Sequence, residues 1–319
     1  MTTVSCQRLR HCLLQHYQRV ASRPQTSAGK HTKIPPLSSS AKKSNHRSFS
    51  VVPNLEEGGF IQPDFRPHRI FLMRHGQSLG NVDESAYVNT ADWRIPITDL
   101  GRKQAKDAGK LLREKISEDD AKVVFYVSPY LRTHQTLNEL LPFFDESEIL
   151  AVQEEPRISE QQIGNFQNVQ QVLNAKDERS KFGRFYYRFP SGEAGLDVYS
   201  RVSSFITTLV RDCTQYNLAG HDLDDVNVVI VTHGLALRLF LMRWFQFSVH
   251  DFEESYNPDN CELVTLEKRK DSCGHSWMEL LEKDRKNLRL PENCGVPRNV
   301  QLHHLQGVSD ECLENTWGV

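Results

Sequence analysis

Two histidines and two arginines in this chain have side chains suited to phosphate chemistry, and each lies shortly after an apolar run. The runs span residues 70–73, 123–127 and 228–231, and the residues after them are Arg74, His75, Arg132 and His233. A guanidinium can bind phosphate oxygens in a bidentate way, and an imidazole can attack phosphorus or donate a hydrogen bond. Open parallel sheets bind ligands at the carboxyl ends of their strands, so these residues would meet if the runs are neighbouring parallel strands. The sequence therefore predicts a phosphate-handling enzyme.

Each of these four side chains has a predicted role. Arg74 and Arg132 would bind the phosphate oxygens, and His233 would donate a further hydrogen bond from its ring. With so much positive charge present, His75 is better placed as the nucleophile than as one more donor. Its Nε2 must then be unprotonated, and we expect its Nδ1–H to be held by a backbone carbonyl.

Two further residues are predicted to bind the substrate. Asn81 lies in the loop after the first run, where its side-chain amide can donate a proton. Gly234 comes just before a predicted helix, and the backbone amides at a helix N-terminus favour an anion. We therefore expect both residues at the phosphate site.

The leaving alcohol needs a proton donor, and the candidate is Glu160, in the segment Arg157–Gly164. A carboxyl group beside a bound dianion can have a raised pKa, which suits an acid that later acts as a base. Other carboxylates compete with it, and spacing alone does not choose among them. The competitors are Glu154, Glu155 and Glu193.

The elements that must position these residues alternate between strand-like and helix-like segments over residues 66–268. Strands are predicted at 69–73, 123–127, 149–152, 227–232 and 261–267, and helices at 98–116, 131–141, 193–213 and 234–246. Thr98 is the expected N-cap of the first helix. Its apolar face is predicted to contain Leu100, Ala105, Ala108, Leu111 and Leu112. This alternation predicts an α/β domain with a mostly parallel central sheet.

The first 55 residues differ in composition from the rest of the chain, because they contain no Asp or Glu and are rich in hydroxyl and basic residues. This composition is typical of an organelle transit peptide, and we expect residues 1–55 to be disordered. Their Ser-, Pro- and Lys-rich part favours a plastid. An Arg-bearing amphipathic helix over residues 7–20 would favour a mitochondrion, and a disordered tail on a cytoplasmic protein is the remaining alternative.

The other end of the chain, residues 269–319, is polar with weak periodicity and is predicted to be a loosely ordered tail. Its Cys and His residues match no standard spacing of metal ligands, so neither a metal nor another cofactor is expected. A formal charge of −2 and a pI of about 6.7 lack the basic footprint of a nucleic-acid binder. The apolar stretch 228–247 contains His233, Arg238 and Arg243 where a bilayer would bury them. The expected partner is a small phosphorylated substrate, with no membrane and no nucleic acid.

Several short motifs resemble, in order, those of the histidine phosphatase superfamily. They are Arg74-His75-Gly76-Gln77-Ser78-x-x-Asn81, Pro96-x-Thr98-x-x-Gly101-x-x-Gln104-Ala105, Ser128-Pro129-x-x-Arg132-Thr133-x-x-Thr136, Glu160-x-x-x-Gly164, Ser191-Gly192-Glu193 and Thr232-His233-Gly234. The match extends over residues 69–267, and within the superfamily the chain is similar to the plant phosphoglycerate mutase-like proteins. The resemblance implies a three-layer α/β/α fold, no metal cofactor and a phosphohistidine on His75. It also implies Glu160 as the proton donor and Arg74, Arg132 and His233 as the phosphoryl-binding residues.

The chain also departs from the mutases of this superfamily. Gln77 stands where they usually carry Glu, and Gly80 where many carry Trp. Glu160 and Glu193 are only about 30 residues apart, whereas cofactor-dependent phosphoglycerate mutases have a longer insertion with arginines for a second phosphate. A mutase must protect its phosphohistidine from water, so the short segment favours a phosphatase.

The expected enzyme is therefore a phosphomonoesterase for a small metabolite, with a role in carbohydrate metabolism as the first expectation. The alternatives are a cofactor-dependent phosphoglycerate mutase and a non-catalytic binding protein. Arg184 and Arg188 are the cations that could bind a second anionic group and so keep the mutase alternative open.

Overall fold

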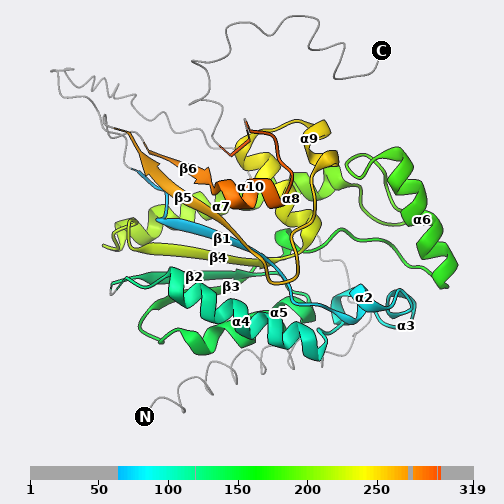
Figure 1. Cartoon of the computed structure of the whole chain (residues 1–319), viewed down its shortest axis with the longest axis horizontal. Coiled ribbons are helices and arrows are strands. Elements are labelled where there is room, and N and C mark those ends of the chain that lie inside the picture. Colours follow the sequence, from blue (N-terminus) through cyan, green and yellow to red (C-terminus); the bar gives the residue numbers. More distant parts are fainter. Residues whose placement is uncertain (1–63, 119, 272–275, 293, 296–319) are drawn as a thin grey trace, which may run out of the picture. The chain divides into compact units, whose positions relative to one another are not determined.

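The computed structural model describes residues 64–118, 120–271, 276–292 and 294–295, and these residues form a six-stranded sheet (Figure 1). The strands lie in the order β3-β2-β4-β1-β5-β6. Their bounds are β1 Arg69–Arg74, β2 Lys122–Val127, β3 Ile149–Glu154, β4 Val226–Thr232, β5 Leu263–Lys270 and β6 Ser276–Leu280.

The strands β1 to β4 run parallel to one another. The central strand β4 pairs with β1 and β2, and β3 pairs with β2. All residues of β4 are buried, as expected for a Val- and Ile-rich strand in a parallel sheet covered on both faces. β5 is antiparallel to β1, and β6 is antiparallel to β5. The carboxyl ends of β1, β2 and β4 therefore lie side by side at one end of the sheet.

Helices cover both faces of the sheet and make three layers (Figure 1). On one face, α4 and α5 share a core with residues such as Phe71 of β1. On the other face, α7 and α8 share a core with its neighbour Leu72, because successive strand residues point to opposite faces. The bounds are α4 Asp99–Lys115, α5 Leu131–Leu140, α7 Gly195–Leu218 and α8 Gly234–Phe245.

Shorter elements lie in the connections. They are α2 Leu79–Val82, α3 Ala86–Asn89, η1 Asp92–Arg94, η2 Leu141–Phe143, η3 Pro156–Ile158, α6 Val169–Phe182, α9 Val249–Glu254 and α10 Glu282–Asn287. Figure 1 shows α2, α3 and α6 on the side of the sheet where β1 and β4 end. The connections that follow the strands are thus gathered at the end of the sheet that carries the predicted site.

The predicted three-layer α/β fold with a mostly parallel sheet is confirmed, and each predicted strand and helix is present with small differences at its ends. The helix α6 was not predicted. It begins after the N-cap Asn168, whose side chain accepts the Gln171 N–H. Its buried residues are only Val172 and Ala175, which is too few for a clear helical period.

In α4, the first of the predicted helices, apolar spacing predicts the buried residues only in part. Thr98 caps it as predicted, since its hydroxyl accepts the Gly101 N–H at 3.0 Å. Leu100 and Leu111 were expected on its apolar face, but they are 50% and 45% exposed. The other predicted members of that face are buried: Ala105, Ala108 and Leu112. Because consecutive helix residues are about 100° apart, the buried stripe is narrower than the predicted one.

A loosely ordered tail from residue 269 is wrong for the part of it that the structure describes. β5 continues to Lys270, β6 adds an edge strand, and α10 follows. Met278 and Leu280 of β6 are buried in the core on the α7 side, while the outer position of the strand explains its polar composition. Residues 296–319 and the predicted transit peptide lie outside the described residues. Within the described ranges, no helix is long and apolar enough to cross a bilayer.

Candidate active site

The ends of β1 and β4 bring the two predicted histidines together. The His75 backbone N–H donates to the Thr232 carbonyl at 3.0 Å, which continues the pairing of β1 with β4 by one residue. The rings of His75 and His233 have centroids 5.1 Å apart and meet edge to face. Their side chains are 3% and 0% exposed. Two residues far apart in the sequence thus share one buried site because their strands are neighbours.

A hydrogen bond determines which ring nitrogen of His75 carries the proton. Its Nδ1 lies 2.8 Å from the Gly76 carbonyl oxygen, as predicted. A carbonyl can only accept, so Nδ1 carries the hydrogen and Nε2 keeps its lone pair. Burial lowers the pKa of His75 well below its ordinary value, and the charges of Arg132 and Arg74 lower it further against the effect of the Gly76 bond. The ring is therefore neutral at neutral pH, as a nucleophile requires.

His233 lies between the end of β4 and the start of α8, where it contacts the loop after β2. Its Nε2 is 2.8 Å from Ser128 Oγ, and the Tyr130 ring packs against it at 4.9 Å. Burial, and then the charge of Arg132, lowers the pKa of His233 well below its ordinary value. Its Nδ1 is buried and has no hydrogen-bond partner among the residues described. This nitrogen can therefore take part in ligand binding.

Arg132 is buried at the start of α5, with its side chain held in place from one side. Its Nη1 donates to the Asp92 backbone carbonyl at 2.7 Å and to the Asp92 carboxylate at 2.8 Å. The guanidinium also lies over the Tyr130 ring, 4.7 Å from its centroid. Its Nε and Nη2 form no hydrogen bond with any described residue, so these donors can bind phosphate oxygens.

Arg74 ends β1 and belongs to the same electrostatic environment. Its Nη1 donates to the Pro258 carbonyl at 3.0 Å. Burial lowers the pKa of Arg74, and the negative charge of Glu160 is the main opposing influence. The charges of Arg74 and Arg132 both lower the pKa of His75. The two predicted phosphate-binding cations therefore both act on the predicted nucleophile.

Two backbone N–H groups and one close backbone approach hold the loop after β1 against α4 and α5. The Gly76 N–H donates to Thr136 Oγ1 at 2.9 Å, and the Gln77 N–H donates to Gln104 Oε1 at 2.9 Å. A Cβ atom on residue 76 would lie 2.5 Å from the Gly101 carbonyl oxygen. The glycine after His75 is thus required by a close backbone approach, and the other motif residues fix the loop that carries the nucleophile.

The two predicted substrate-binding residues lie in α2 and at the start of α8. Asn81 Oδ1 accepts the Ser78 N–H at 3.0 Å, whereas its Nδ2 forms no hydrogen bond within the described part of the chain. That Nδ2 group is the predicted donor. Gly234 is the first residue of α8, and a side chain there would collide with the Asn257 amide.

The three carboxylates that compete with Glu160 for the role of general acid all have basic partners. Each competitor faces a cationic or basic partner from 2.6 to 3.0 Å away. The pairs are Glu154 with His134, Glu155 with Arg157, and Glu193 with Arg201. The carboxylate of each competitor is thus already bound to a partner of its own.

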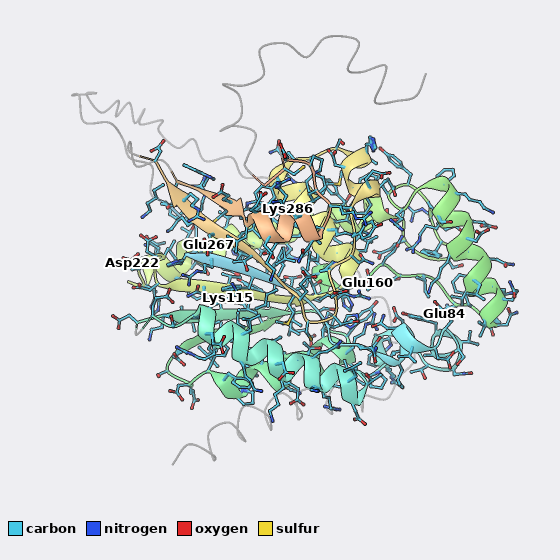
Figure 2. The ribbon with its side chains drawn as sticks, in the orientation of Figure 1. Glu84, Lys115, Glu160, Asp222, Glu267 and Lys286 are labelled. Carbon is cyan, nitrogen blue, oxygen red and sulfur yellow. The ribbon has the colours of Figure 1, made fainter. Side chains whose placement is uncertain are left out.

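Glu160 forms no ion pair with any residue that the structure describes. Its Oε1 accepts the Gln161 N–H at 2.9 Å, and its charge acts on Arg74 at the phosphate site. Figure 2 labels Glu160 beyond the ends of the strands, on the side where α2 and α6 lie. The geometry therefore favours Glu160 over its three competitors.

The segment that carries Glu160 is held by Arg201 of α7. Arg201 Nη1 donates to the carbonyls of Arg157 and Ser159 at 2.8 and 2.7 Å, and Nη2 donates to the Glu160 carbonyl at 2.9 Å. The same guanidinium binds the Glu193 carboxylate through Nε and Nη2 at 3.1 and 3.0 Å. Arg201 and Glu193 thus fix the backbone of the candidate acid, and the charge of Arg201 is also among those that lower the pKa of His233.

The two cations predicted for a second anionic group differ in their surroundings. Arg188 is exposed and pairs with Asp197 at 2.6 Å, so its charge is already neutralised. Arg184 is half-buried, and its Nη1 donates to the Glu253 carbonyl at 3.4 Å without an ion pair among the described residues. The structure disfavours Arg188 as a ligand for a second anionic group. For Arg184 this role stays a prediction.

Residues 70–279 match the sequence pattern of the Histidine phosphatase superfamily (branch 1). This range contains all the residues predicted for catalysis and phosphate binding. The chain belongs to this superfamily. The Phosphoglycerate mutase-like proteins AT74H and AT74 of Arabidopsis thaliana are each 46% identical to it, over 211 residues (63% of this chain, 74% of the relative) and 213 residues (65% and 67%). The predicted resemblance is thereby confirmed.

A more distant relative of this chain is the Broad-range acid phosphatase DET1 of Saccharomyces cerevisiae. It is 28% identical over 293 aligned residues, which cover 63% of this chain and 86% of the relative. The solved structure named Mycobacterial hydrolase 1 shares the fold with a TM-score of 0.53 at 20% identity, over 67% of this chain and 97% of that one. A mycobacterial glucosyl-3-phosphoglycerate phosphatase with VO3 gives 0.51 at 20% identity, over 67% and 98%.

Sequence reasoning missed three residues that position the site: Asp92, Arg201 and Asn260. Asp92 binds Arg132, and the Asn260 amide donates to the His75 carbonyl at 2.8 Å. No pattern in the sequence marks Asp92 or Asn260. Arg201 is weakly marked, because a charge at this position interrupts the inward face of α7 next to buried Val202. Among the described residues, no group of three or more His, Cys, Asp or Glu could hold a metal ion.

Proposed function

We propose that this histidine phosphatase is a phosphomonoesterase that acts on a small phosphorylated metabolite through a phosphohistidine on His75. The observation that carries the proposal is the 2.8 Å contact between His75 Nδ1 and the Gly76 carbonyl. It leaves an unprotonated Nε2 on a neutral, buried ring beside His233 and within the field of Arg74 and Arg132. Such a nitrogen is an activated nucleophile in a site that favours a dianion.

In the first step, His75 Nε2 attacks the phosphorus atom and the bond from phosphorus to the ester oxygen breaks. Arg74, Arg132 and a ring N–H of His233 bind the three equatorial oxygens as their charge redistributes. The carboxyl of Glu160 gives its proton to the leaving alkoxide, which departs as an alcohol. The products of this step are a phosphohistidine and a Glu160 carboxylate.

In the second step, water attacks the phosphohistidine while Glu160 takes one of its protons. The bond from phosphorus to Nε2 breaks, and inorganic phosphate leaves. His75 returns to its starting tautomer because Nδ1 stays bonded to the Gly76 carbonyl throughout. Glu160 is again protonated and ready for the next turnover.

Hydrolysis is favoured over phosphoryl transfer by the short connection between Glu160 and Glu193. It contains one helix, α6, whose only buried residues are Val172 and Ala175. A mutase needs a cover that keeps water from the phosphohistidine, and a helix with so few buried residues is a weakly anchored one. The name of the yeast relative, an acid phosphatase, supports the same choice. A substrate from carbohydrate metabolism remains part of the proposal.

The test is phosphate release by the full chain from a panel of phosphate esters, with 3-phosphoglycerate plus 2,3-bisphosphoglycerate as the mutase assay. We expect phosphate release that is lost in His75→Ala, and an acid-labile, alkali-stable phosphoprotein in the wild type after rapid quenching. His221→Ala is the matched control, because this histidine lies before β4, at the opposite end of the sheet from the site. Conversion of 3- to 2-phosphoglycerate without phosphate release would replace the phosphatase by a mutase.

We further propose that residues 1–55 direct import into a plastid, with a mitochondrion as the alternative. The support is their lack of acidic residues and their Ser, Lys and Arg content. A fusion of residues 1–65 to a fluorescent protein should enter isolated chloroplasts and become shorter on import. A fusion that stays outside both organelles would leave the chain in the cytoplasm.

A further inference from the structure

Tyr130 lies between two of the residues that are predicted to bind the phosphoryl group. The Arg132 guanidinium lies over its ring, 4.7 Å from the centroid, and the His233 ring meets it edge to face at 4.9 Å. His233 in turn contacts the ring of His75 at 5.1 Å. One tyrosine ring therefore touches both a cation and a histidine of the site, and that histidine contacts the nucleophile.

The backbone of Tyr130 is fixed at the start of α5, where this residue is the N-cap. Its carbonyl accepts the Thr133 hydroxyl at 2.6 Å and the backbone N–H groups of Thr133 and His134, both at 3.1 Å. These bonds form the first turn of the helix. The ring therefore cannot leave the site unless that turn opens.

The hydroxyl of Tyr130 has no partner within the protein, although the residue is only 9% exposed. It forms no hydrogen bond with any residue that the structure describes. It is also not among the fully enclosed, unpartnered atoms of those residues, so a ligand can reach it. Tyr126 of β2 shows the usual arrangement, since its buried hydroxyl donates to Asp212 at 2.9 Å. Because hydroxyls of buried residues are normally hydrogen-bonded, we expect a bound molecule to supply the partner of Tyr130.

Charged groups of the site act on this hydroxyl. Burial raises the pKa of Tyr130 above its ordinary value, and the charge of Asp92 raises it further against the effect of Arg132. The negative charge of Glu160 also raises this pKa. The hydroxyl therefore keeps its proton at neutral pH, and toward an anion it acts as a hydrogen-bond donor.

We propose that Tyr130 is a further catalytic residue, whose hydroxyl donates a hydrogen bond to an oxygen of the phosphoryl group held by Arg132 and His233. The phosphoryl oxygens are favoured over the leaving group because both residues that the ring touches are predicted to bind them. The proton stays on Tyr130, so the hydroxyl stabilises charge and takes no part in proton transfer. The inference rests on the proposed function, because the group it binds is the one transferred to His75.

Tyr130→Phe removes the hydroxyl and keeps the ring between Arg132 and His233. We expect kcat/KM of the full chain to fall about 10- to 100-fold, as the loss of a hydrogen bond to a charged group would give. The factor should be the same for phenyl phosphate and p-nitrophenyl phosphate. Inhibition by orthovanadate, which carries the oxygens without a leaving group, should weaken by a similar factor. Steady-state phosphate release measures all three.

Tyr216→Phe is the matched control. The Tyr216 hydroxyl accepts from Gln153 at 3.3 Å, and its carbonyl accepts the N–H of His221, which lies before β4 at the opposite end of the sheet from the site. This variant should leave kcat/KM and the orthovanadate Ki as they are. Tyr130→Phe loses no hydrogen bond with the described residues, so it should unfold at the urea concentration of the wild type.

Two results with the folded Tyr130→Phe variant overturn the inference. An unchanged kcat/KM would mean that the hydroxyl is bound by water only. A loss for phenyl phosphate alone, with unchanged inhibition by orthovanadate, would place the hydroxyl at the leaving group instead of the phosphoryl oxygens.

Failure of the proposed function gives a different result. If the wild type releases phosphate from no ester, the phosphatase proposal fails, and the binding of orthovanadate and inorganic phosphate to the wild type and to Tyr130→Phe is measured by calorimetry. A Kd that rises about tenfold or more in Tyr130→Phe supports the hydroxyl as a donor to the bound anion. Equal Kd values, or no binding to the wild type, overturn the inference as well.

Discussion

The site at the strand ends and the α6 segment, residues 161–192, lie on either side of Glu160 but are built in different ways. At the strand ends, His75 is held by the Thr232 carbonyl and the Gly76 carbonyl, and Arg132 is held by Asp92. Within the α6 segment, the helix itself buries only Val172 and Ala175 and is attached by polar contacts such as Lys176 with Glu84, whereas Phe185 after the helix is buried against Phe252. Figure 2 shows Glu84 on the side of the molecule where α2 and α3 lie.

The difference indicates a division of labour. Groups that do chemistry need fixed geometry, which the hydrogen-bonded ends of a buried sheet provide. Substrate choice can depend on a segment with few buried contacts, because such segments open at low free-energy cost. Changes at the strand ends should therefore affect the rate with every substrate, and changes in the α6 segment should affect the choice among substrates.

Replacing a phosphate-binding cation should have the largest effect. Arg132→Gln should lower kcat/KM by about a thousandfold, or roughly 4 kcal/mol, for all phosphate esters, because a fixed charge on the transferred phosphoryl group is lost. Steady-state phosphate release measures it. Arg102→Gln, an exposed arginine of α4 that pairs with Glu139, is the control. A loss below tenfold in Arg132→Gln would contradict the assigned role.

Glu160→Gln should produce a loss that depends on the leaving group. We expect about a hundredfold lower kcat/KM for phenyl phosphate and a much smaller loss for p-nitrophenyl phosphate, whose leaving group needs no proton. Glu193→Gln tests the comparison, because the Glu193 carboxylate already binds Arg201 and the Gln162 N–H. It should lower both rates by the same factor, and a leaving-group dependence in Glu193→Gln instead would move the acid to that residue.

A methyl group in the loop after β1 should reduce stability. Gly76→Ala places a Cβ 2.5 Å from the Gly101 carbonyl oxygen, so we expect a loss of about 1–3 kcal/mol in the free energy of unfolding. Leu173→Ala, on the exposed side of α6, should change it by less than about 0.5 kcal/mol. Urea unfolding measures both. Similar losses in the free energy of unfolding in the two variants would contradict the difference between the strand ends and α6.

The buried histidines predict how stability depends on pH. Burial and the arginines hold the pKa of His75 and His233 well below the unfolded-state value, so the unfolded chain binds protons that the folded chain does not. The contribution of these histidines to the free energy of unfolding is complete above about pH 6.5. It decreases as the pH falls toward the folded-state pKa, by at most about 1.4 kcal/mol per pH unit for each histidine. His233→Asn should flatten this slope in denaturant unfolding between pH 7.5 and 5.5. An unchanged slope would mean that His233 is charged in the folded protein.

The smallest effect is expected at the ion pair between α6 and the loop after β1. Lys176→Met removes a partly exposed pair, so the free energy of unfolding should fall by less than about 1 kcal/mol, which is a Tm shift of at most a few degrees. A thousandfold fall in kcat would place α6 in the chemistry itself.

Much of the fold and most of the candidate site could be predicted from local patterns. The apolar runs marked the strands, and His75, Arg132 and His233 came directly or shortly after them. The helix α6 and the strand β6 were missed because few of their residues are buried. The exposed Leu100 and Leu111 show that apolar spacing alone does not say which helix positions face the sheet.

The sequence by itself determined which side chains could do the chemistry, because a strand end places the residue that follows it at a known edge of a parallel sheet. Only the tertiary structure distinguishes Glu160 from its three competitors, since each competitor has a basic partner and Glu160 forms no ion pair with any described residue. It also brought Asp92 to Arg132 and Arg201 to the Glu160 carbonyl. Contacts between residues that are distant in the sequence leave no periodic pattern. They depend on how the whole chain folds, and not on the local spacing of residue types.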